Sequence, residues 1–130
     1  MMPPTPESEA MRRLEGKVAV ISGTSGGIGA ATARRLASEG AKVVLADINL
    51  EGAEKTAQTV RDAGGEAIAL HLDLAEESSI KGLIDQAAAR YGQIDVLFNN
   101  AADTRYETML HDAAVAFMDA DLWDSVFRIN

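Results

Sequence analysis

The stretch Lys17-Val-Ala-Val-Ile-Ser-Gly-Thr-Ser-Gly-Gly-Ile-Gly29 joins a short apolar run to a dense cluster of glycines. Its first part, Lys17–Ser22, is almost continuously apolar, as expected for a strand buried on both faces. From Gly29 to about Glu39 the pattern indicates a helix, and Gly40 stands where a left-handed residue commonly ends one. A strand, a glycine-rich turn and a helix in this order predict the start of a βαβ unit.

The same alternation continues along the chain. Further strands are expected at Lys42–Asp47, Ala67–Asp73 and Asp95–Asn100, and further helices at Glu51–Ala63, Glu76–Tyr91 and from Asp119 or Asp121 onward. Four strands alternating with helices predict right-handed crossovers between parallel strands. The fold class is therefore α/β, an open, doubly wound parallel sheet with helices on both faces. Such sheets bind ligands at the carboxyl ends of their strands, where the strand order reverses.

Length and composition favour one soluble domain. The 130 residues include three prolines, all within the first six positions, so residues 1–15 are expected to form a flexible tail and residues 16–130 the folded domain. No apolar run approaches the ~18–20 residues that cross a bilayer, and the N-terminus does not resemble a secretory signal. With no cysteine, the chain has no disulfide or thiolate metal site, which fits a cytoplasmic location.

The charge distribution argues against several classes of ligand. The net charge is −8 and there is no basic stripe, so nucleic acid and anionic membranes are poor partners. Asp119, Asp121 and Asp124 form an acidic cluster that helix capping explains better than metal binding. His71 and His111 are expected to be packing or surface residues. No metal site is predicted.

The glycine cluster has the composition of a phosphate-binding loop. Gly23 permits a sharp turn out of the strand, Gly27 lets a pyrophosphate approach the backbone, and Gly29 allows close packing of the helix. The helix that follows offers unpaired N–H groups and a partial positive charge to an anion. A strand before the loop and a helix after it favour dinucleotide binding over a plain turn. A P-loop is excluded, because no Gly-Lys-Ser/Thr ends the cluster.

Asp47 indicates which dinucleotide would bind. It ends the second expected strand, about 20 residues after the glycines, where an acidic residue accepts hydrogen bonds from the adenosine ribose. A carboxylate there would repel a 2′-phosphate, and neither Ser25 nor Ile48 supplies a basic side chain to neutralise one. The sequence therefore predicts NAD in preference to NADP.

Four motifs at the expected strand ends together resemble the short-chain dehydrogenase/reductase family, from about residue 14 onward. They are Ser22-Gly-x-x-x-Gly-Ile-Gly29, Asp47, Asp73-Leu74 and Asn99-Asn-Ala-Ala102. The chain departs from the family motifs at Ser22, which replaces threonine, and at Ala102, which replaces glycine. The resemblance implies a Rossmann-type sheet that binds NAD through Gly23, Ser25, Gly26, Gly27, Ile28, Gly29, Asp47, Ile48, Asp73, Leu74, Asn100, Ala101 and Ala102.

The final segment, Trp123-Asp-Ser-Val-Phe-Arg-Ile-Asn130, resembles the family helix that ends in a catalytic asparagine. The resemblance gives Asn130 the role of holding a proton-relay water. The family's Tyr-x-x-x-Lys pair has no counterpart, because Tyr91 is followed four residues later by Asp95 and Tyr106 by Leu110. The chain is therefore expected to be the cofactor-binding half of a truncated domain.

The resemblance implies an oxidoreductase that interconverts a small alcohol and a carbonyl by hydride transfer, and a homo-oligomer, either a dimer or a tetramer. One alternative is a non-catalytic dinucleotide-binding module or inactive truncated fragment. Another is an S-adenosylmethionine methyltransferase, which also uses a glycine loop and an acidic strand end; the glycine spacing and Asn99-Asn-Ala favour the dehydrogenase. In the truncated chain Asp95–Asn100 is expected to be a long, unpaired apolar edge that promotes self-association.

Overall fold

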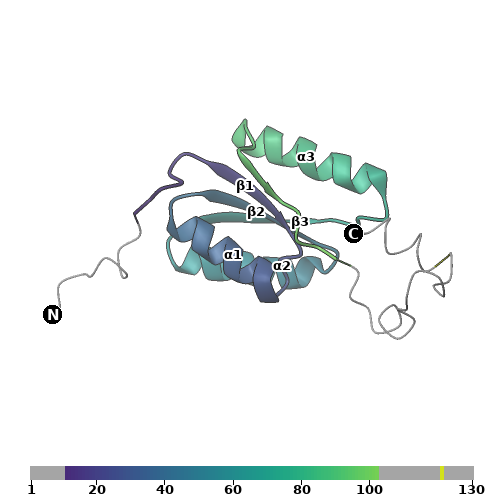
Figure 1. The fold of residues 1–130 in the computed structure, drawn as a ribbon, viewed down its shortest axis with the longest axis horizontal. Coiled ribbons are helices and arrows are strands. Elements are labelled where there is room, and N and C mark those ends of the chain that lie inside the picture. Colours follow the sequence, from purple (N-terminus) through teal and green to yellow (C-terminus); the bar gives the residue numbers. More distant parts are fainter. Residues whose placement is uncertain (1–10, 103–120, 122–130) are drawn as a thin grey trace, which may run out of the picture.

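The structure is a computed structural model that describes residues 11–102 and residue 121. In chain order the elements are β1 (Val18–Ser22), α1 (Gly27–Ser38), β2 (Lys42–Asp47), α2 (Leu50–Asp62), β3 (Glu66–His71), α3 (Glu77–Tyr91) and β4 (Val96–Phe98). The four strands form one parallel sheet in the order β3-β2-β1-β4 (Figure 1). The predicted α/β class and the alternation of strands and helices are confirmed.

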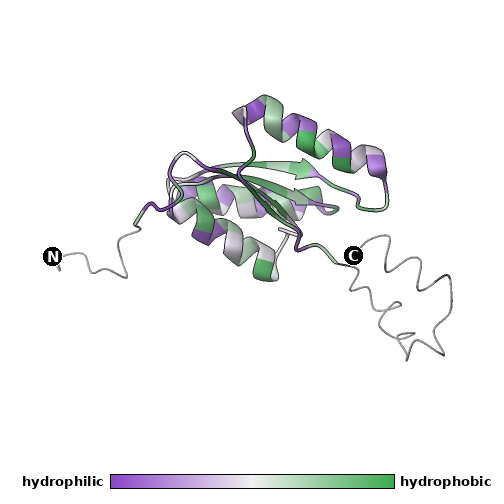
Figure 2. Ribbon diagram, turned by 45° about the horizontal axis from the view of Figure 1, so that its top comes forward, coloured by the Kyte–Doolittle hydropathy of each residue, from purple (hydrophilic) through white to green (hydrophobic). Residues whose placement is uncertain are grey.

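The two central strands carry the most hydrophobic sequences. Every residue of β1 is buried, and in β2 only the first and last residues reach solvent. Ile21 of β1 pairs in register with Leu45 of β2 on one side and with Phe98 of β4 on the other. Figure 2 shows the apolar residues of these strands, as expected for central parallel strands that helices cover on both faces.

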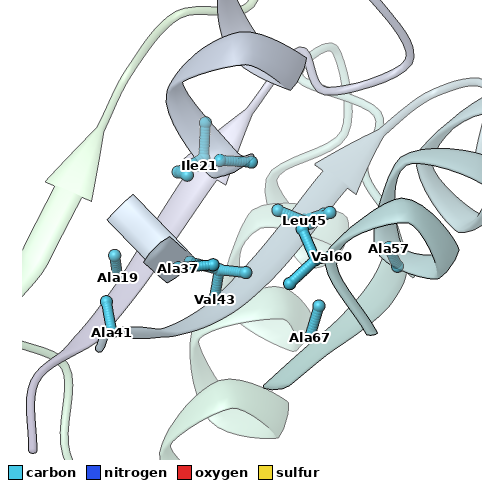
Figure 3. Close-up of a cluster of buried hydrophobic side chains, with 10 residues drawn as sticks. Ala19, Ile21, Ala37, Ala41, Val43, Leu45, Ala57, Val60 and Ala67 are labelled. Carbon is cyan, nitrogen blue, oxygen red and sulfur yellow. The ribbon is translucent and has the colours of Figure 1, made fainter. Parts of the chain in front are cut away.

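The side chains of the sheet alternate between two apolar clusters. On the face covered by α1 and α2, Ile21, Val43 and Leu45 pack against Ala33 and Val60 (Figures 1 and 3). On the opposite face, α3 covers a smaller cluster whose buried members are Val20, Val44, Ala46, Leu72, Leu83 and Ala87. The period of two along each strand thus places helices on both faces, as predicted.

Two helices end at the glycines that the sequence indicated. Gly40 follows α1 with a φ of 99°, and Gly92 follows α3 with a φ of 77°. Both values lie in the left-handed region, which a residue with a Cβ atom adopts only at a cost. These glycines stop the helices where the chain must turn back into a strand.

The strand boundaries differ from the predicted ones by more than one residue at two places, the ends of β3 and β4. β3 ends at His71 rather than Asp73, and β4 covers three residues rather than the six of Asp95–Asn100. Among the described residues β4 pairs with β1, and it ends at Phe98 because the N–H groups of Asn100 and Ala101 donate to a side chain instead of a strand. β4 does lie at the edge of this sheet, with Leu97 52% exposed, but the edge is shorter than expected.

A short segment before β1 is tied to the end of α1. The Leu14 N–H donates to the Glu39 carbonyl at 2.9 Å, and Leu14 packs against the first apolar cluster. The buried Glu39 carboxylate accepts from Arg13 at 3.0 Å and from Arg35 at 2.9 Å. The hydrogen bonds from Arg13, with the charges of Arg13 and Arg35, lower the pKa of Glu39.

Most of the expected tail and everything expected from Asp103 to Asn130, apart from Asp121, lie outside the described residues. This includes His111, Asp119, Asp124 and the last expected helix. In the described part of the chain, no helix is both long and apolar enough to span a bilayer.

Candidate functional site

The glycine loop, Asp47 and Asn100 meet at the carboxyl ends of the strands. Gly23 follows β1, Asp47 ends β2, and Asn100 comes two residues after β4. The chain leaves β1 toward β2 on one side, while β4 pairs on the other side, so the strand order reverses at β1. The predicted position of the site, at the switch point of an open parallel sheet, is therefore the position at which these residues gather.

Two of the loop glycines are required by close contacts. Gly23 has a φ of 76°, and a Cβ atom there would lie 3.0 Å from both the Ala101 Cα and the Asn100 Nδ2. At the buried Gly29, a Cβ atom would overlap the carbonyl oxygen of Gly23. The loop can therefore fold back against the first turn of α1 only because both positions lack a side chain.

Gly26 and Gly27 face open space instead. Both are exposed, and a Cβ atom built on either would meet no heavy atom of the described residues within 4 Å. The space beside these backbones is what a ligand group needs to approach the chain closely. Gly27 also has a φ of 61°, so a side chain there would add backbone strain to the loss of space.

The first turn of α1 is free of competing acids. Gly26 is its N-cap and offers no side-chain hydrogen bond, and no acidic residue lies in the first turn. The partial positive charge at this end of the helix is therefore available to an external anion. Ile28 projects from the same turn and is 72% exposed.

The Asp47 carboxylate joins the end of β2 to the glycine loop. Oδ2 accepts from the Ser25 backbone N–H at 2.9 Å, and Oδ1 accepts from the Asn49 backbone N–H at 2.8 Å. Each oxygen keeps further capacity to accept, because an ionised carboxylate has about four lone-pair sites. The neighbouring Ile48 is 66% exposed and offers an apolar surface beside the carboxylate. None of these residues is basic.

The end of β4 is held to the end of β1 by polar contacts. The buried Ser22 Oγ accepts from the backbone N–H groups of Asn100 and Ala101, each at 3.1 Å. The Asn100 side-chain Nδ2 donates to the Gly23 carbonyl at 3.1 Å. Asn100 and Ala101 are thus placed against the glycine loop, whereas Ala102 is exposed.

Asp73 and Leu74 lie in the turn after β3, at the same edge of the sheet but beyond β2. Asp73 Oδ1 accepts from the Ala75 N–H at 3.0 Å, and the Asp73 N–H donates to Ser79 Oγ at 2.9 Å. Leu74 packs against the second apolar cluster, so its side chain faces the core.

Two residues of α2 that the sequence did not single out touch the loop. Thr56 Oγ1 donates to the Thr24 carbonyl at 2.7 Å, and Gly52 lies against Ser25. The available signal was a hydroxyl in the otherwise apolar buried row of Ala53, Ala57 and Val60.

Asn130 lies outside the described residues. Across residues 11–102 and residue 121, no group of three or more acidic or histidine side chains could hold a metal ion.

Comparison with known families gives one match across most of the chain. The profile of the short chain dehydrogenase family matches residues 17–130. Among characterised and uncharacterised relatives, an uncharacterized oxidoreductase of Bacillus subtilis, YxbG, is 42% identical over 120 residues, which are 92% of this chain and 42% of the relative. A 7alpha-hydroxysteroid dehydrogenase of Bacteroides fragilis is 39% identical over 120 residues, which are 92% of this chain and 45% of the relative.

Solved structures agree with the sequence relatives. A crystal structure of a hydroxysteroid dehydrogenase from Escherichia coli superposes with a TM-score of 0.65 and 37% identity, covering 66% of this chain and 35% of that one. A further sequence relative, a cis-4-hydroxycyclohexanecarboxylate dehydrogenase of Sinomonas cyclohexanicum, is 42% identical over 114 residues, which are 88% of this chain and 43% of the relative. The chain thus spans less than half the length of the curated relatives it matches.

Proposed function

The chain belongs to the short-chain dehydrogenase family, and from this we propose that it forms the NAD-binding part of an oxidoreductase that interconverts a small alcohol and a carbonyl. The observation that carries the proposal is the meeting of the glycine loop, the Asp47 carboxylate and Asn100 at one edge of the sheet. The family implies a nicotinamide dinucleotide, and the residues at this edge fit such a group.

Each part of the dinucleotide finds a suitable group on the chain. The open space at Gly26 and Gly27, with the uncapped start of α1, suits the pyrophosphate. The free acceptor sites of Asp47 suit the two adenosine ribose hydroxyls. The exposed face of Ile48 and the turn at Asp73-Leu74 suit the adenine. Asn100, Ala101 and Ala102 are assigned to the second ribose, beside β1 and β4.

NAD is proposed over NADP because of the charge at Asp47. A 2′-phosphate would lie against this carboxylate, whose two oxygens are already fixed by the N–H groups of Ser25 and Asn49. Neither Ser25 nor Ile48 can supply a compensating cation. Repulsion between the Asp47 carboxylate and an adjacent 2′-phosphate would disfavour the phosphorylated cofactor.

A bound nicotinamide dinucleotide would supply the hydride chemistry of such a reaction. The residues of this chain would bind and orient it: the loop would hold the pyrophosphate, Asp47 the adenosine end, and Asn100 and Ala101 the second ribose. By resemblance to the family, Asn130 holds the water of a proton relay. The proposal includes a homo-oligomer, a dimer or tetramer, which sedimentation equilibrium would test.

Calorimetric titration of the full-length protein with NAD⁺ and NADP⁺ tests the proposal. We expect NAD⁺ to bind at least about tenfold more tightly than NADP⁺. The Asp47→Asn variant should weaken NAD⁺ binding about 10- to 100-fold, because it removes charge-assisted hydrogen bonds. Asp85→Asn is the control, since it removes the same charge from an exposed residue of α3 that pairs with Lys81 on its own helix.

The outcomes separate the parts of the proposal. Equal affinity for both cofactors would refute NAD selection by Asp47, and no binding of either would refute the cofactor site. Oxidation of any of a panel of secondary alcohols would refute the non-catalytic binding module. Competition of NAD⁺ by S-adenosylmethionine would favour the methyltransferase alternative.

A further inference from the structure

The glycine loop contacts α2 through its residue Thr24. Thr24 is fully buried, and the Thr24 hydroxyl donates to the Ala46 carbonyl at 3.3 Å. The Thr24 carbonyl points to α2, where Thr56 Oγ1 donates to it at 2.7 Å. The next residue, Ser25, is tied to Asp47 through its backbone N–H. The loop is therefore fixed at two consecutive residues, on the side away from Gly26 and Gly27.

α2 can approach the loop this closely because of Gly52. A Cβ atom at Gly52 would lie 2.5 Å from the Ser25 Cβ and 2.8 Å from the Asn49 Nδ2. Gly52 and Thr56 are four residues apart, so they lie on the same face of the helix. One face of α2 thus contacts the loop at two places, one through van der Waals contact and one through a hydrogen bond.

The hydroxyl of Thr56 is not explained by packing. Thr56 is 5% exposed, and its buried neighbours on α2 are Ala53, Ala57 and Val60. An alanine or valine would complete this apolar row, and β-branched threonine is a weak helix former. The hydroxyl also makes a longer contact, 3.3 Å, with the Gly52 carbonyl of its own helix. Its shorter bond leaves the helix and ends on the loop.

A loop built largely from glycine has little conformational preference of its own. A ligand that needs one loop conformation must then supply the ordering free energy itself, unless another element fixes the loop beforehand. We propose that Thr56 is a positioning residue for the pyrophosphate of the dinucleotide, acting through the Thr24 carbonyl to keep the loop in its binding conformation. This inference rests on the proposed function.

The test compares ligands that do and do not contain phosphate. In the full-length protein, Thr56→Val keeps the shape of the side chain and removes the hydroxyl, while Thr56→Ser keeps the hydroxyl. Calorimetry would measure the dissociation constants of NAD⁺, ADP and adenosine. Thr56→Val should weaken NAD⁺ and ADP about tenfold and change adenosine less than about twofold, the size expected for one buried hydrogen bond. Thr56→Ser should restore the affinity for NAD⁺ and ADP to within about twofold of wild type.

Thr59→Val is the matched control. Thr59 lies about one turn after Thr56 on α2, and its hydroxyl donates at 2.7 Å to the Thr56 carbonyl within the helix rather than to the loop. The affinity of the Thr59→Val variant for all three ligands should match that of the wild type. Thermal unfolding of each variant would show how much of any change is a general loss of stability.

Several results would overturn the inference. Equal losses for adenosine and ADP in Thr56→Val, or the same losses in Thr59→Val, would assign a general structural role to the hydroxyl. Failure of both Thr56→Val and a second variant, Thr56→Ala, to fold would assign it to stability and count against the proposal. If the wild type binds NAD⁺ and Thr56→Val binds it equally well, the inference alone fails. If the wild type binds neither NAD⁺ nor ADP, the proposed function fails with it.

Discussion

The Ser22 hydroxyl oxygen lies 3.1 Å from the backbone nitrogen of Asn100 and accepts its hydrogen bond. The same oxygen accepts from the Ala101 N–H, also at 3.1 Å. These bonds take the place of a continued ladder between β1 and β4, which ends at the Ile21–Phe98 pair. One buried hydroxyl therefore satisfies two N–H groups at the point where the chain enters the site.

Ser22→Ala should destabilise the protein by about 1–3 kcal/mol, because it leaves two partly buried N–H groups without an acceptor. Urea unfolding would measure the change. Ser22→Thr keeps the hydroxyl and should lose less than half as much. Equal losses in the two variants would show that packing of the side chain, not the hydroxyl, matters here.

Gly29→Ala and Gly26→Ala should differ in their effect on stability. The first places a Cβ atom on the Gly23 carbonyl, and we expect a loss of more than about 2 kcal/mol of stability from this overpacking. The second places it in open space with a φ of −177°, so stability should change by less than about 1 kcal/mol. If the pyrophosphate occupies that space, Gly26→Ala should nevertheless weaken NAD⁺ binding. Unchanged affinity in a folded Gly26→Ala variant would contradict this placement.

Glu39→Gln should lower stability in a pH-dependent way. The pKa of Glu39 is lowered from its ordinary value of 4.5, chiefly by the hydrogen bond from Arg13. The unfolded chain therefore binds a proton at Glu39 more readily than the folded chain does. The stabilisation from the Glu39 charge is full above the unfolded pKa and is lost as the pH falls through the lower folded pKa. The urea midpoints of wild type and variant should differ at pH 7 and draw together as the pH falls below 4.5.

Glu51→Gln is the control for this pH series. Glu51 lies on α2 with its side chain 83% exposed and pairs with Lys55 at 3.6 Å. An exposed pair of this kind contributes little, so its urea midpoint should follow that of the wild type at every pH. A constant difference between wild type and Glu39→Gln down to pH 3 would mean that the charge of Glu39 is not what stabilises the fold.

Asp95→Asn should loosen the attachment of β4. The Asp95 Oδ2 accepts from the Val18 N–H at 2.8 Å and from Gln93 Nε2 at 2.6 Å, and the first of these bonds is the main cause of the lowered pKa of Asp95. Asparagine keeps one acceptor but loses the charge. Hydrogen exchange at Val18 and Phe98 should accelerate, while exchange at Val44 in β2 should not. Uniform acceleration across the sheet would indicate global destabilisation instead.

The sequence predicted the elements well where local signals were strong. The apolar runs that became β1 and β2 and the glycines at 40 and 92 each act within a few residues, so their pattern carries the information. β4 was predicted too long because its end depends on a distant partner: the Ser22 hydroxyl takes the N–H groups that a longer strand would use.

The site was predictable in its parts but not in its connections. The glycine spacing and Asp47 are visible in the sequence because backbone conformation and charge restrict which residues can stand there. The bonds from Ser25 to Asp47 and from Thr56 to Thr24 join positions 22 and 32 residues apart. The first depends on how the ends of β1 and β2 lie side by side, and the second on where α2 packs against the loop, neither of which a local pattern encodes.

The strand order also has a consequence for how the chain folds. β1–β2 and β2–β3 join strands that are consecutive in the chain, whereas β1 meets β4 only after both of the intervening units. Closing that interval, roughly three times longer than the one between β1 and β2, costs about 1 kcal/mol more in loop entropy. During synthesis the three-strand unit that holds the glycine loop and Asp47 emerges before β4 does. We therefore expect the part of the proposed site around Asp47 to be assembled first and the docking of Asn100 to follow as a separate folding event.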